Sequence, residues 1–307
     1  MSLSDPGFSP KENEDAVNDL ILNGYIESLR NMTSDDTVLR LSQYGGKKWA
    51  QLKDTDDKEE LVDAQEGDRR RRATREHDAT PVSKASRNMM LFNYLEDHGT
   101  TSLSVVDKDR NAVTITSSIN LEFGSKIASP STGIIFNNQM DDFATPGRAD
   151  YFGLDPSESN YVAPGKRALS SMSPTMVFRN HGNDADSGKL VLTLGGSGGP
   201  KIISSVLQTI LNFAFLGMPL YESVSAPRIH NQLLYHGAAG SNIEQDTLPQ
   251  GPLVKLSERT LASLEKRGHK VIPSDFLGAV QAVAVDLESD TLTAVSDIRK
   301  QGMPAGY

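Results

Sequence analysis

The sequence predicts an α+β protein in which stacked β-sheets are flanked by helices. From residue 101 onward, short β-branched and apolar runs alternate with turn residues, which is typical of strands. Only a few segments between these runs space their apolar residues as a helix does. Runs of strands with a few helices outside them favour layered sheets covered by helices.

The predicted strands and helices follow in chain order. The strands are residues 103–105 and 112–116 around a turn at 107–111, then 133–136, 189–194, 279–285 and 291–295, the last two forming a closing hairpin. The helices are residues 202–214, directly after the glycine-rich run 195–200, and residues 256–266, which end in cationic side chains.

The first third of the chain differs in composition from the rest. Residues 1–99 hold 20 acidic and 14 basic side chains, whereas residues 100–307 hold 20 and 17. We therefore predict a charged, partly disordered segment over 1–99 and a globular region over 100–307. One amphipathic helix is expected over residues 16–29. The arginine run 69–72 is interpreted as a solvated loop in preference to a localisation signal or processing site.

Composition excludes several classes of protein. The absence of cysteine rules out disulfides, a cysteine nucleophile and thiolate-bound metals. A net charge of −9 disfavours nucleic acid as a partner. The six histidines lack metal-ligand spacing, so neither a metal nor an organic cofactor is expected. Neither a signal peptide nor an apolar run of membrane-spanning length is visible.

Eight short segments, in order from Gly99 to Tyr307, together resemble the sequence pattern of one known protein family. They are residues 99–107, 116–125, 133–143, 164–166, 169–175, 195–199, 226–232 and 297–307. In content and spacing they resemble the small subunit of gamma-glutamyltranspeptidases. The resemblance implies an N-terminal-nucleophile hydrolase fold, a four-layer αββα sandwich that is incomplete here at its N-terminal side.

The same resemblance implies that the chain cuts itself between Gly99 and Thr100 and uses Thr100 as the nucleophile. A threonine hydroxyl needs a nearby base. The α-amine released by the cut has a reference pKa of about 8, so it can serve as that base. Ser118 would orient the Thr100 hydroxyl. Without the resemblance, Thr100 would be read as a loop threonine and Ser118 as an ordinary strand serine.

The resemblance also assigns an oxyanion hole to Gly198 and Gly199. Backbone N–H groups of glycine can turn toward a ligand, and the helix predicted after them would favour negative charge. A phosphate-binding loop is the competing interpretation. It is disfavoured because Pro200-Lys201-Ile202 does not supply the Lys-Ser/Thr pair that such a loop requires.

The substrate-binding residues implied by the resemblance suit a γ-glutamyl compound. Asp142, with Asn120 and Gln139 as neutral partners, would hold the donor's α-ammonium. Ser170 and Ser171 would donate to its α-carboxylate. The plainer alternatives are a helix cap at 141–142 and a turn at 170–171. The donor would be glutathione, and the acceptor an amino acid, a dipeptide or water.

The chain departs from the family's pattern in two places. Ser102 stands where histidine is frequent, and only 99 residues precede the expected cut, although the family's large subunit has several hundred. That subunit also supplies the arginine that binds the substrate carboxylate. Three interpretations therefore stay open: an active transferase or hydrolase, alone or with a large-subunit partner; an inactive truncated product; or a non-catalytic binding protein. Relatives are secreted, periplasmic or membrane-anchored, and no compartment is assigned here.

Overall fold

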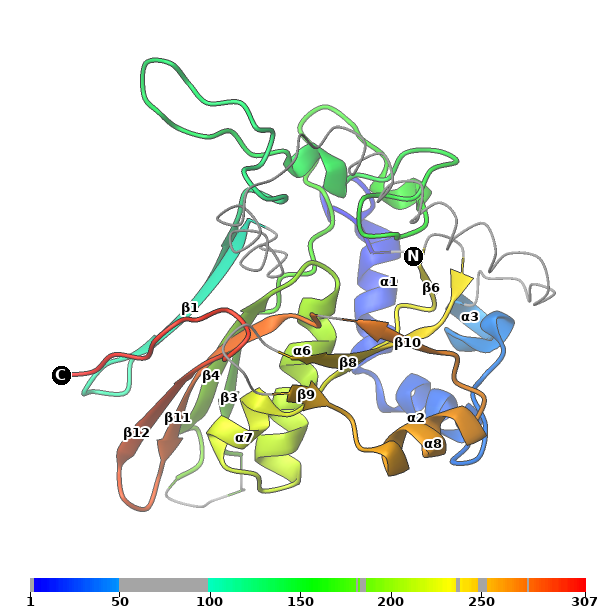
Figure 1. Ribbon diagram of the computed structural model, residues 1–307. Helices are drawn as coiled ribbons and strands as arrows, with labels where there is room; N and C mark the ends of the chain where they lie inside the picture. The colour runs from blue at the N-terminus through cyan, green and yellow to red at the C-terminus, as the bar shows by residue number, and fades with distance from the viewer. Residues whose placement is uncertain are drawn as a thin grey trace, which may run out of the picture.

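The computed structural model describes residues 3–49, 99–180, 182, 186–235, 238–247, 253–274 and 276–307 (Figure 1). The helices are α1 Pro10–Ile21, α2 Asn23–Met32, α3 Gly46–Trp49, α6 Lys201–Ile210, α7 Leu220–Ser225 and α8 Glu258–Lys266. A π-helical turn, η4 (Leu211–Phe215), continues α6, and 3₁₀ turns are η1 Leu41–Gln43, η2 Gln139–Asp142 and η3 Glu158–Asn160. The arginine run 69–72 lies outside the described residues.

The strands form a central sheet and smaller ones. They are β1 Thr100–Val106, β2 Ala112–Ser118, β3 Thr175–Phe178, β4 Leu190–Ser197, β5 Ile229–His230, β6 Leu234–Tyr235, β7 Ala238–Ala239, β8 Ser241–Thr247, β9 Leu253–Lys255, β10 Val271–Ser274, β11 Ala279–Asp286 and β12 Thr291–Ser296. The central sheet has the order β12-β11-β4-β3 and is antiparallel throughout. A smaller sheet has the order β10-β8-β5, with β9 paired to β8, and β6 pairs with β7.

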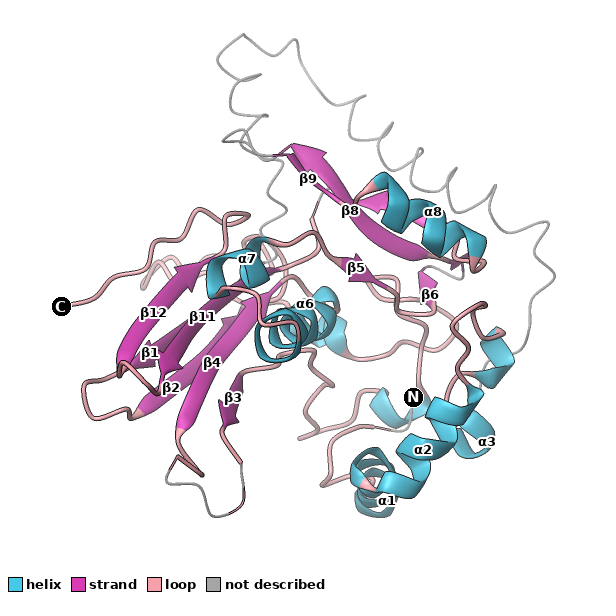
Figure 2. Cartoon of the chain, turned by 90° about the horizontal axis from the view of Figure 1, so that it is seen from below, coloured by secondary structure: helices cyan, strands magenta, loops and turns pink. Residues whose placement is uncertain are grey.

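Helices and the β1–β2 hairpin cover opposite faces of the central sheet. On one face, α6 contacts β4 and β11, and α7 contacts β11 and β12. On the other, β1 contacts β4 and β11, and the Ser104 hydroxyl donates to the Gln281 carbonyl of β11 over 3.3 Å. Figures 1 and 2 show the same arrangement, with α6 and α7 on the side of the sheet opposite to β1. The described elements therefore form three layers, helix, sheet and sheet.

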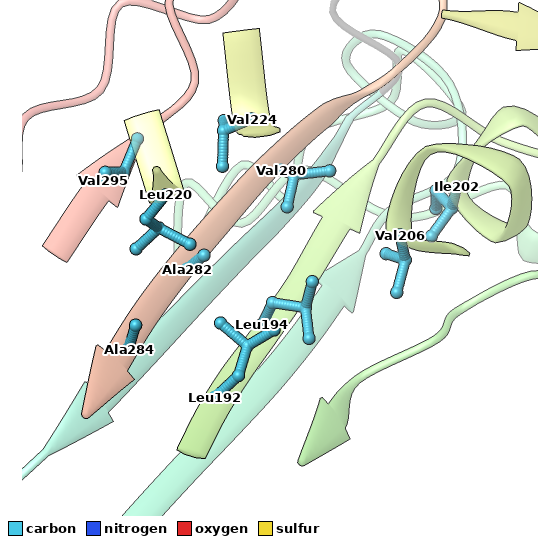
Figure 3. Packing of buried hydrophobic residues seen from close by; sticks show 10 residues of the cluster. All are labelled: Leu192, Leu194, Ile202, Val206, Leu220, Val224, Val280, Ala282, Ala284 and Val295. Atoms are coloured by element: carbon cyan, nitrogen blue, oxygen red, sulfur yellow. The ribbon is translucent and has the colours of Figure 1, made fainter. Parts of the chain in front are cut away.

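The hydrophobic core lies between the central sheet and its helices (Figure 3). Its buried members are Leu192 and Leu194 from β4, Ile202 and Val206 from α6, Leu220 and Val224 from α7, Val280, Ala282 and Ala284 from β11, and Val295 from β12. Burial of apolar area at about 25 cal/mol per Å² makes this cluster the main source of stability in the layer. α6 enters it because its apolar residues recur on one face of the helix.

The β1–β2 hairpin turns its apolar side away from the central sheet. Its inward positions are small and polar: Ser102, Ser104, Thr114 and Thr116. Its outward positions are Leu103, Val105, Val113 and Ile115, each between 47% and 58% exposed. A sheet with one solvated face ordinarily shows the reverse pattern. The fourth layer of the predicted αββα sandwich is not among the described elements.

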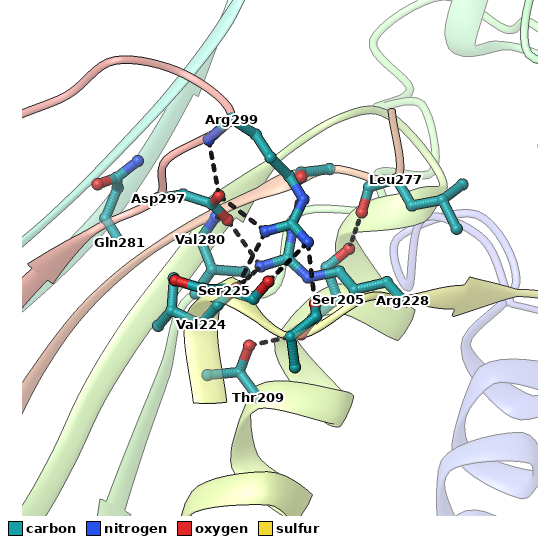
Figure 4. Close-up of polar contacts among 12 residues, drawn as sticks. Ser205, Thr209, Val224, Ser225, Arg228, Leu277, Val280, Gln281, Asp297 and Arg299 are labelled. Atoms are coloured by element: carbon teal, nitrogen blue, oxygen red, sulfur yellow. Dashed lines mark hydrogen bonds and ion pairs between the residues drawn. The ribbon is translucent and has the colours of Figure 1, made fainter. Parts of the chain in front are cut away.

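A buried ion network joins segments that lie far apart in the chain. Arg228 contacts Asp297 at 2.7 Å, and Arg299 contacts Asp297 at 3.0 Å and Glu244 at 2.5 Å. Both guanidinium groups also donate to the Val224 carbonyl at the end of α7. Burial alone would raise the pKa of the Asp297 carboxyl, but the two arginines outweigh it and hold that pKa below its usual range. Figure 4 shows how the two arginines converge on Asp297.

Several predicted elements are confirmed. The β1–β2 hairpin forms around the predicted turn, with Leu103 opposite Ile115. β4, α6, α8 and the closing hairpin of β11 and β12 also lie where the sequence indicated. Within the described residues, no helix is both long enough and apolar enough to cross a membrane.

Other predictions were wrong. Residues 133–136 form no strand; they belong to a projecting arm in which Ile134 and Phe136 make backbone hydrogen bonds to residues 125–129, and only one isolated bridge forms, between Ala128 and Ile135. The apolar run pairs only with this short segment of its own arm and its side chains stay exposed, and such a short two-stranded pairing is marginal without a packed face. The single helix over 16–29 is two helices, because the chain is extended at Leu22. The strand predicted over 189–194 extends into the glycine-rich run, since β4 continues to Ser197.

We predict that Glu244→Gln lowers the free energy of unfolding by about 3 kcal/mol, because it leaves the buried Arg299 guanidinium one carboxylate short. Urea unfolding followed by circular dichroism measures the change. The control is Asp290→Asn, which weakens an exposed pair with Arg110 and should cost under about 1 kcal/mol. Equal effects of the two substitutions would contradict the prediction.

Candidate active site

Thr100 and Ser118 are brought together by the register of the β1–β2 hairpin. Thr100 is the first residue of β1 and lies directly opposite Ser118, the last residue of β2. Their hydroxyl oxygens are 2.7 Å apart, and the Thr100 residue is only 7% exposed. The Asn120 backbone N–H donates to the Ser118 oxygen over 2.8 Å. The Ser118 hydroxyl is thus fixed between the strand end and the following turn.

Gly99, just before Thr100, has a conformation that requires glycine. Its φ is +56°, and an added Cβ would lie 2.3 Å from the Leu121 carbonyl oxygen. The Gly99 carbonyl accepts a hydrogen bond of 3.0 Å from the Ile119 N–H. The carbonyl of the Gly99–Thr100 peptide bond therefore already faces a backbone donor.

The predicted oxyanion pair lies between β4 and α6. Gly198 is buried and Gly199 is half-buried, directly before the first turn of α6. Gly199 has a φ of +60°, and a Cβ there would lie 2.7 Å from the Phe152 ring. The ammonium group of Lys300 contacts both the Thr100 carbonyl and, at 3.3 Å, the Ser197 hydroxyl. Lys300 thereby connects Thr100 to the end of β4, one residue before the glycine pair.

The residues predicted to bind an α-ammonium also lie together. The Gln139 side-chain amide donates to the Asp142 carboxylate. The buried Asn120 amide donates to the Asn138 carbonyl over 3.2 Å, next to Gln139 in the chain. Since Asn120 follows Ser118 by two residues, this cluster adjoins the Thr100 hydroxyl through the turn after β2.

Negative charge is concentrated around Asp142. Burial raises the pKa of its carboxyl, opposed by the Gln139 hydrogen bond and assisted by the charge of Asp141. Burial also raises the pKa of Asp150 to about 6, against hydrogen bonds from Leu154 and Phe152 and with the charges of Asp141 and Asp142 adding to it. The Asp141 Oδ2 atom is buried and accepts no hydrogen bond from the described residues. A cation placed here would reduce the repulsion among these carboxylates and could donate to the Asp141 oxygen.

Ser170 and Ser171 are connected to this cluster through Asn160. The Asn160 side-chain amide donates to the Asp142 carbonyl over 2.8 Å, and its oxygen accepts from the Leu169 N–H over 3.0 Å. Ser170 is exposed and Ser171 half-buried, and the Ser170 oxygen accepts a bond of 3.2 Å from the Met172 N–H. The serines therefore lie on a segment that Asn160 ties to the Asp142 loop.

Sequence reasoning assigned no role to three residues of this site. Lys300 was noted only as part of a terminal motif, and its contact with Thr100 spans 200 residues of chain. Asn160 and Asp150 lie in irregular loops where no periodic pattern singles them out. A buried asparagine or a crowded carboxylate is visible only once the loops are placed. Over the residues that the structure describes, histidine, aspartate and glutamate nowhere gather in a group that could hold a metal.

The chain is similar to several known proteins. A family model described as Gamma-glutamyltranspeptidase matches residues 3–307. "Glutathione hydrolase 2" of Arabidopsis thaliana is 34% identical over 100% of this chain and 45% of its own length. "Glutathione hydrolase proenzyme 1" of Schizosaccharomyces pombe is 43% identical over 70% of this chain and 31% of its own length. The chain thus spans less than half the length of either relative.

A solved structure gives the fold. The gamma-glutamyltranspeptidase of Pseudomonas nitroreducens, complexed with L-DON, matches with a TM-score of 0.58 and 34% identity over 67% of this chain and 99% of that chain. The fold is therefore of the N-terminal-nucleophile hydrolase class. Together with the family match over residues 3–307, this similarity shows that the chain belongs to the gamma-glutamyltranspeptidase family.

We predict that Asp150→Asn stabilises the protein at pH 7.5 but not at pH 4. The raised pKa of Asp150 means that the native state binds the carboxyl proton more tightly than the unfolded state does. The protonated carboxyl therefore contributes stability at low pH that is lost as the pH rises through about 6, and asparagine avoids that loss because it carries no charge. The shift corresponds to about 3 kcal/mol, which solvent screening at this half-exposed group reduces to about 1 kcal/mol.

Thermal unfolding at the two pH values measures this effect. The control is Asp155→Asn, an exposed carboxylate in the same loop, which should leave the midpoint unchanged at both. An Asp150→Asn midpoint that is raised equally at pH 4 and pH 7.5 would refute the assignment.

Proposed function

We propose that this chain carries the site for γ-glutamyl transfer or hydrolysis on glutathione and related γ-glutamyl compounds. The observation that carries the proposal is the 2.7 Å contact between the Thr100 and Ser118 hydroxyls, beside a glycine peptide whose carbonyl faces the Ile119 N–H. The family's relatives are named as glutathione hydrolases. The activity and its substrates are transferred from them to this chain as part of the proposal.

The first step would be self-cleavage between Gly99 and Thr100. The Thr100 hydroxyl oxygen attacks the Gly99 carbonyl carbon, the C–N bond breaks, and the nitrogen takes up the hydroxyl proton. Water then hydrolyses the resulting ester to a Gly99 carboxylate and a Thr100 with free hydroxyl and α-amine. The Ile119 N–H, 3.0 Å from the Gly99 oxygen, is placed to stabilise the negative charge that develops there.

The second step would use Thr100 as nucleophile. Its α-amine accepts the hydroxyl proton while the oxygen attacks the donor's γ-carbonyl carbon. Ser118 orients the hydroxyl, and the N–H groups of Gly198 and Gly199 bind the oxyanion, assisted by the positive end of α6. The donor's amide bond breaks and its nitrogen takes the proton. The γ-glutamyl ester on Thr100 then passes to an amino acid, a dipeptide or water.

Recognition of the donor would rest on its two α-substituents. Asp142, with Asn120 and Gln139, would hold the α-ammonium, and the crowding of carboxylates around Asp142 supports a cationic ligand there. The hydroxyls of Ser170 and Ser171 would donate to the α-carboxylate. Their segment lies close enough for Asn160 to bridge it to the Asp142 loop.

We further propose that a large-subunit polypeptide completes the four-layer αββα sandwich over the catalytic region 100–307. Residues 1–99 would be the remnant of that subunit in this chain. Two observations support the partner: this chain spans 45% of its Arabidopsis thaliana relative, and the outer face of β1–β2 presents four half-exposed apolar side chains.

The alternative is a truncated, inactive family member or one that serves as a binding protein. The short coverage of the relatives favours it, because the carboxylate-binding arginine that the family's large subunit supplies has no assigned counterpart here. Intact-mass measurement at neutral pH separates the two possibilities. Two fragments meeting at Gly99–Thr100, absent from Thr100→Ala, support the enzyme. A single uncut mass supports the alternative.

We predict that Ser118→Ala lowers the rate of self-cleavage, and kcat on a γ-glutamyl anilide, by about 10-fold or more, because the Thr100 hydroxyl loses its orienting partner. Fragment appearance by mass spectrometry and anilide release by absorbance measure the two rates. Ser117→Ala is the matched control, since Ser117 is exposed on the opposite face of the same strand. Equal rates in both variants would remove Ser118 from the mechanism.

A further inference from the structure

Lys300 contacts the proposed nucleophile from the C-terminal end of the chain. Its side chain is half-buried, and its ammonium group donates to the Thr100 carbonyl and to the Ser197 hydroxyl, the latter over 3.3 Å. The first contact reaches the beginning of β1 and the second reaches the end of β4. One cation therefore bridges the two strand ends between which the γ-carbonyl of a donor would react.

The backbone that carries Lys300 is rigidly held. The neighbouring Arg299 is 1% exposed and is bound by Glu244 and Asp297. The Lys300 N–H closes a turn by donating to the Asp297 carbonyl over 3.2 Å. Fixing a lysine side chain costs considerable rotamer entropy. Because the backbone of residue 300 is already held in place, the contact with Thr100 does not also have to order that backbone.

Thr100 needs such a contact most after self-cleavage. In the uncut chain, peptide bonds constrain Thr100 on both sides. Once the bond to Gly99 is broken, Thr100 becomes a chain terminus, and terminal residues are poorly ordered unless they are tied down. The Thr100 carbonyl is the backbone group that remains next to the freed amine, so a charge-assisted bond to it restrains both the amine and the hydroxyl.

We propose that Lys300 is a positioning residue that fixes Thr100 through its carbonyl oxygen and sets the nucleophile against the end of β4. The inference rests on the proposed function. It adds a residue from the C-terminal segment to a site otherwise made by the β1–β2 hairpin, the Asp142 loop and the glycine pair. Lys300 touches no substrate atom in this role, and it acts only through Thr100 and Ser197.

The test compares Lys300→Met with Lys300→Arg in the full-length chain. We expect Lys300→Met to lower kcat on a γ-glutamyl anilide by about 10- to 100-fold while KM changes by less than about 3-fold, because orientation and not donor binding is lost. Lys300→Arg, which keeps a cationic donor, should recover most of kcat. Lys255→Met, which removes an exposed lysine, is the matched control and should behave as the unaltered chain does.

Thermal unfolding accompanies these assays, because a purely structural role would lower stability and activity together. If Lys300→Met shifts the unfolding midpoint by more than a few degrees, Lys300→Gln takes its place, since it keeps a neutral donor and most of the side chain. Unchanged kcat in the folded neutral variant would overturn the proposal. So would a loss confined to KM, or a loss that arginine does not recover.

A second readout separates this proposal from the proposed function. If the unaltered chain does not cut itself, the enzyme proposal fails, and hydrogen exchange then tests the Lys300 contact alone. Peptides covering β1 should exchange about 10-fold faster in Lys300→Met and should be unaffected in Lys255→Met. Equal protection of β1 in both variants would overturn the positioning role whether or not the chain is an enzyme.

Discussion

The buried pairing of Arg228 and Arg299 with Asp297 and Glu244 is the interaction on which the rest of the structure depends. Each ion is costly to bury and becomes tolerable only when its partners are present. The network therefore forces α7, β8 and the C-terminal segment into one arrangement. That arrangement fixes the backbone at residue 300, from which a side chain reaches the first residue of β1. The position of the proposed nucleophile thus follows from ionic contacts made far from it.

Around that anchor, the candidate site is assembled from loops that bring like charges together. Burial raises the carboxyl pKa values of Asp142 and Asp150, and the charges of neighbouring carboxylates add to both shifts. Such an arrangement costs stability in the empty protein and is retained where function requires perturbed groups. A ligand with an ammonium group would offset part of this cost on binding.

Sequence alone indicated much of this architecture, for physical reasons that differ between elements. β1 and β2 were predictable because their alternation is local and their turn is rich in Asp and Asn. The role of Ser118 beside Thr100 was implied by the resemblance to gamma-glutamyltranspeptidases and not by any local pattern. Residues 133–136 were mistaken for a strand because β-propensity does not reveal that the run pairs only with a short segment of its own arm and packs against no sheet. Lys300 was missed because one lysine carries no periodic signal and its contacts are distant in the chain.

The topology also sets an order of events during folding. β1 and β2 are joined by a short turn, so the hairpin closes a small loop and forms quickly. β4 pairs with β11 across about 80 intervening residues, a closure that is entropically more costly and slower. The hairpin that bears Thr100 can therefore exist before the sheet on which it docks. Because the Lys300 bridge from Thr100 to Ser197 needs both, the proposed nucleophile can be fixed against the end of β4 only after the strands of the central sheet have assembled.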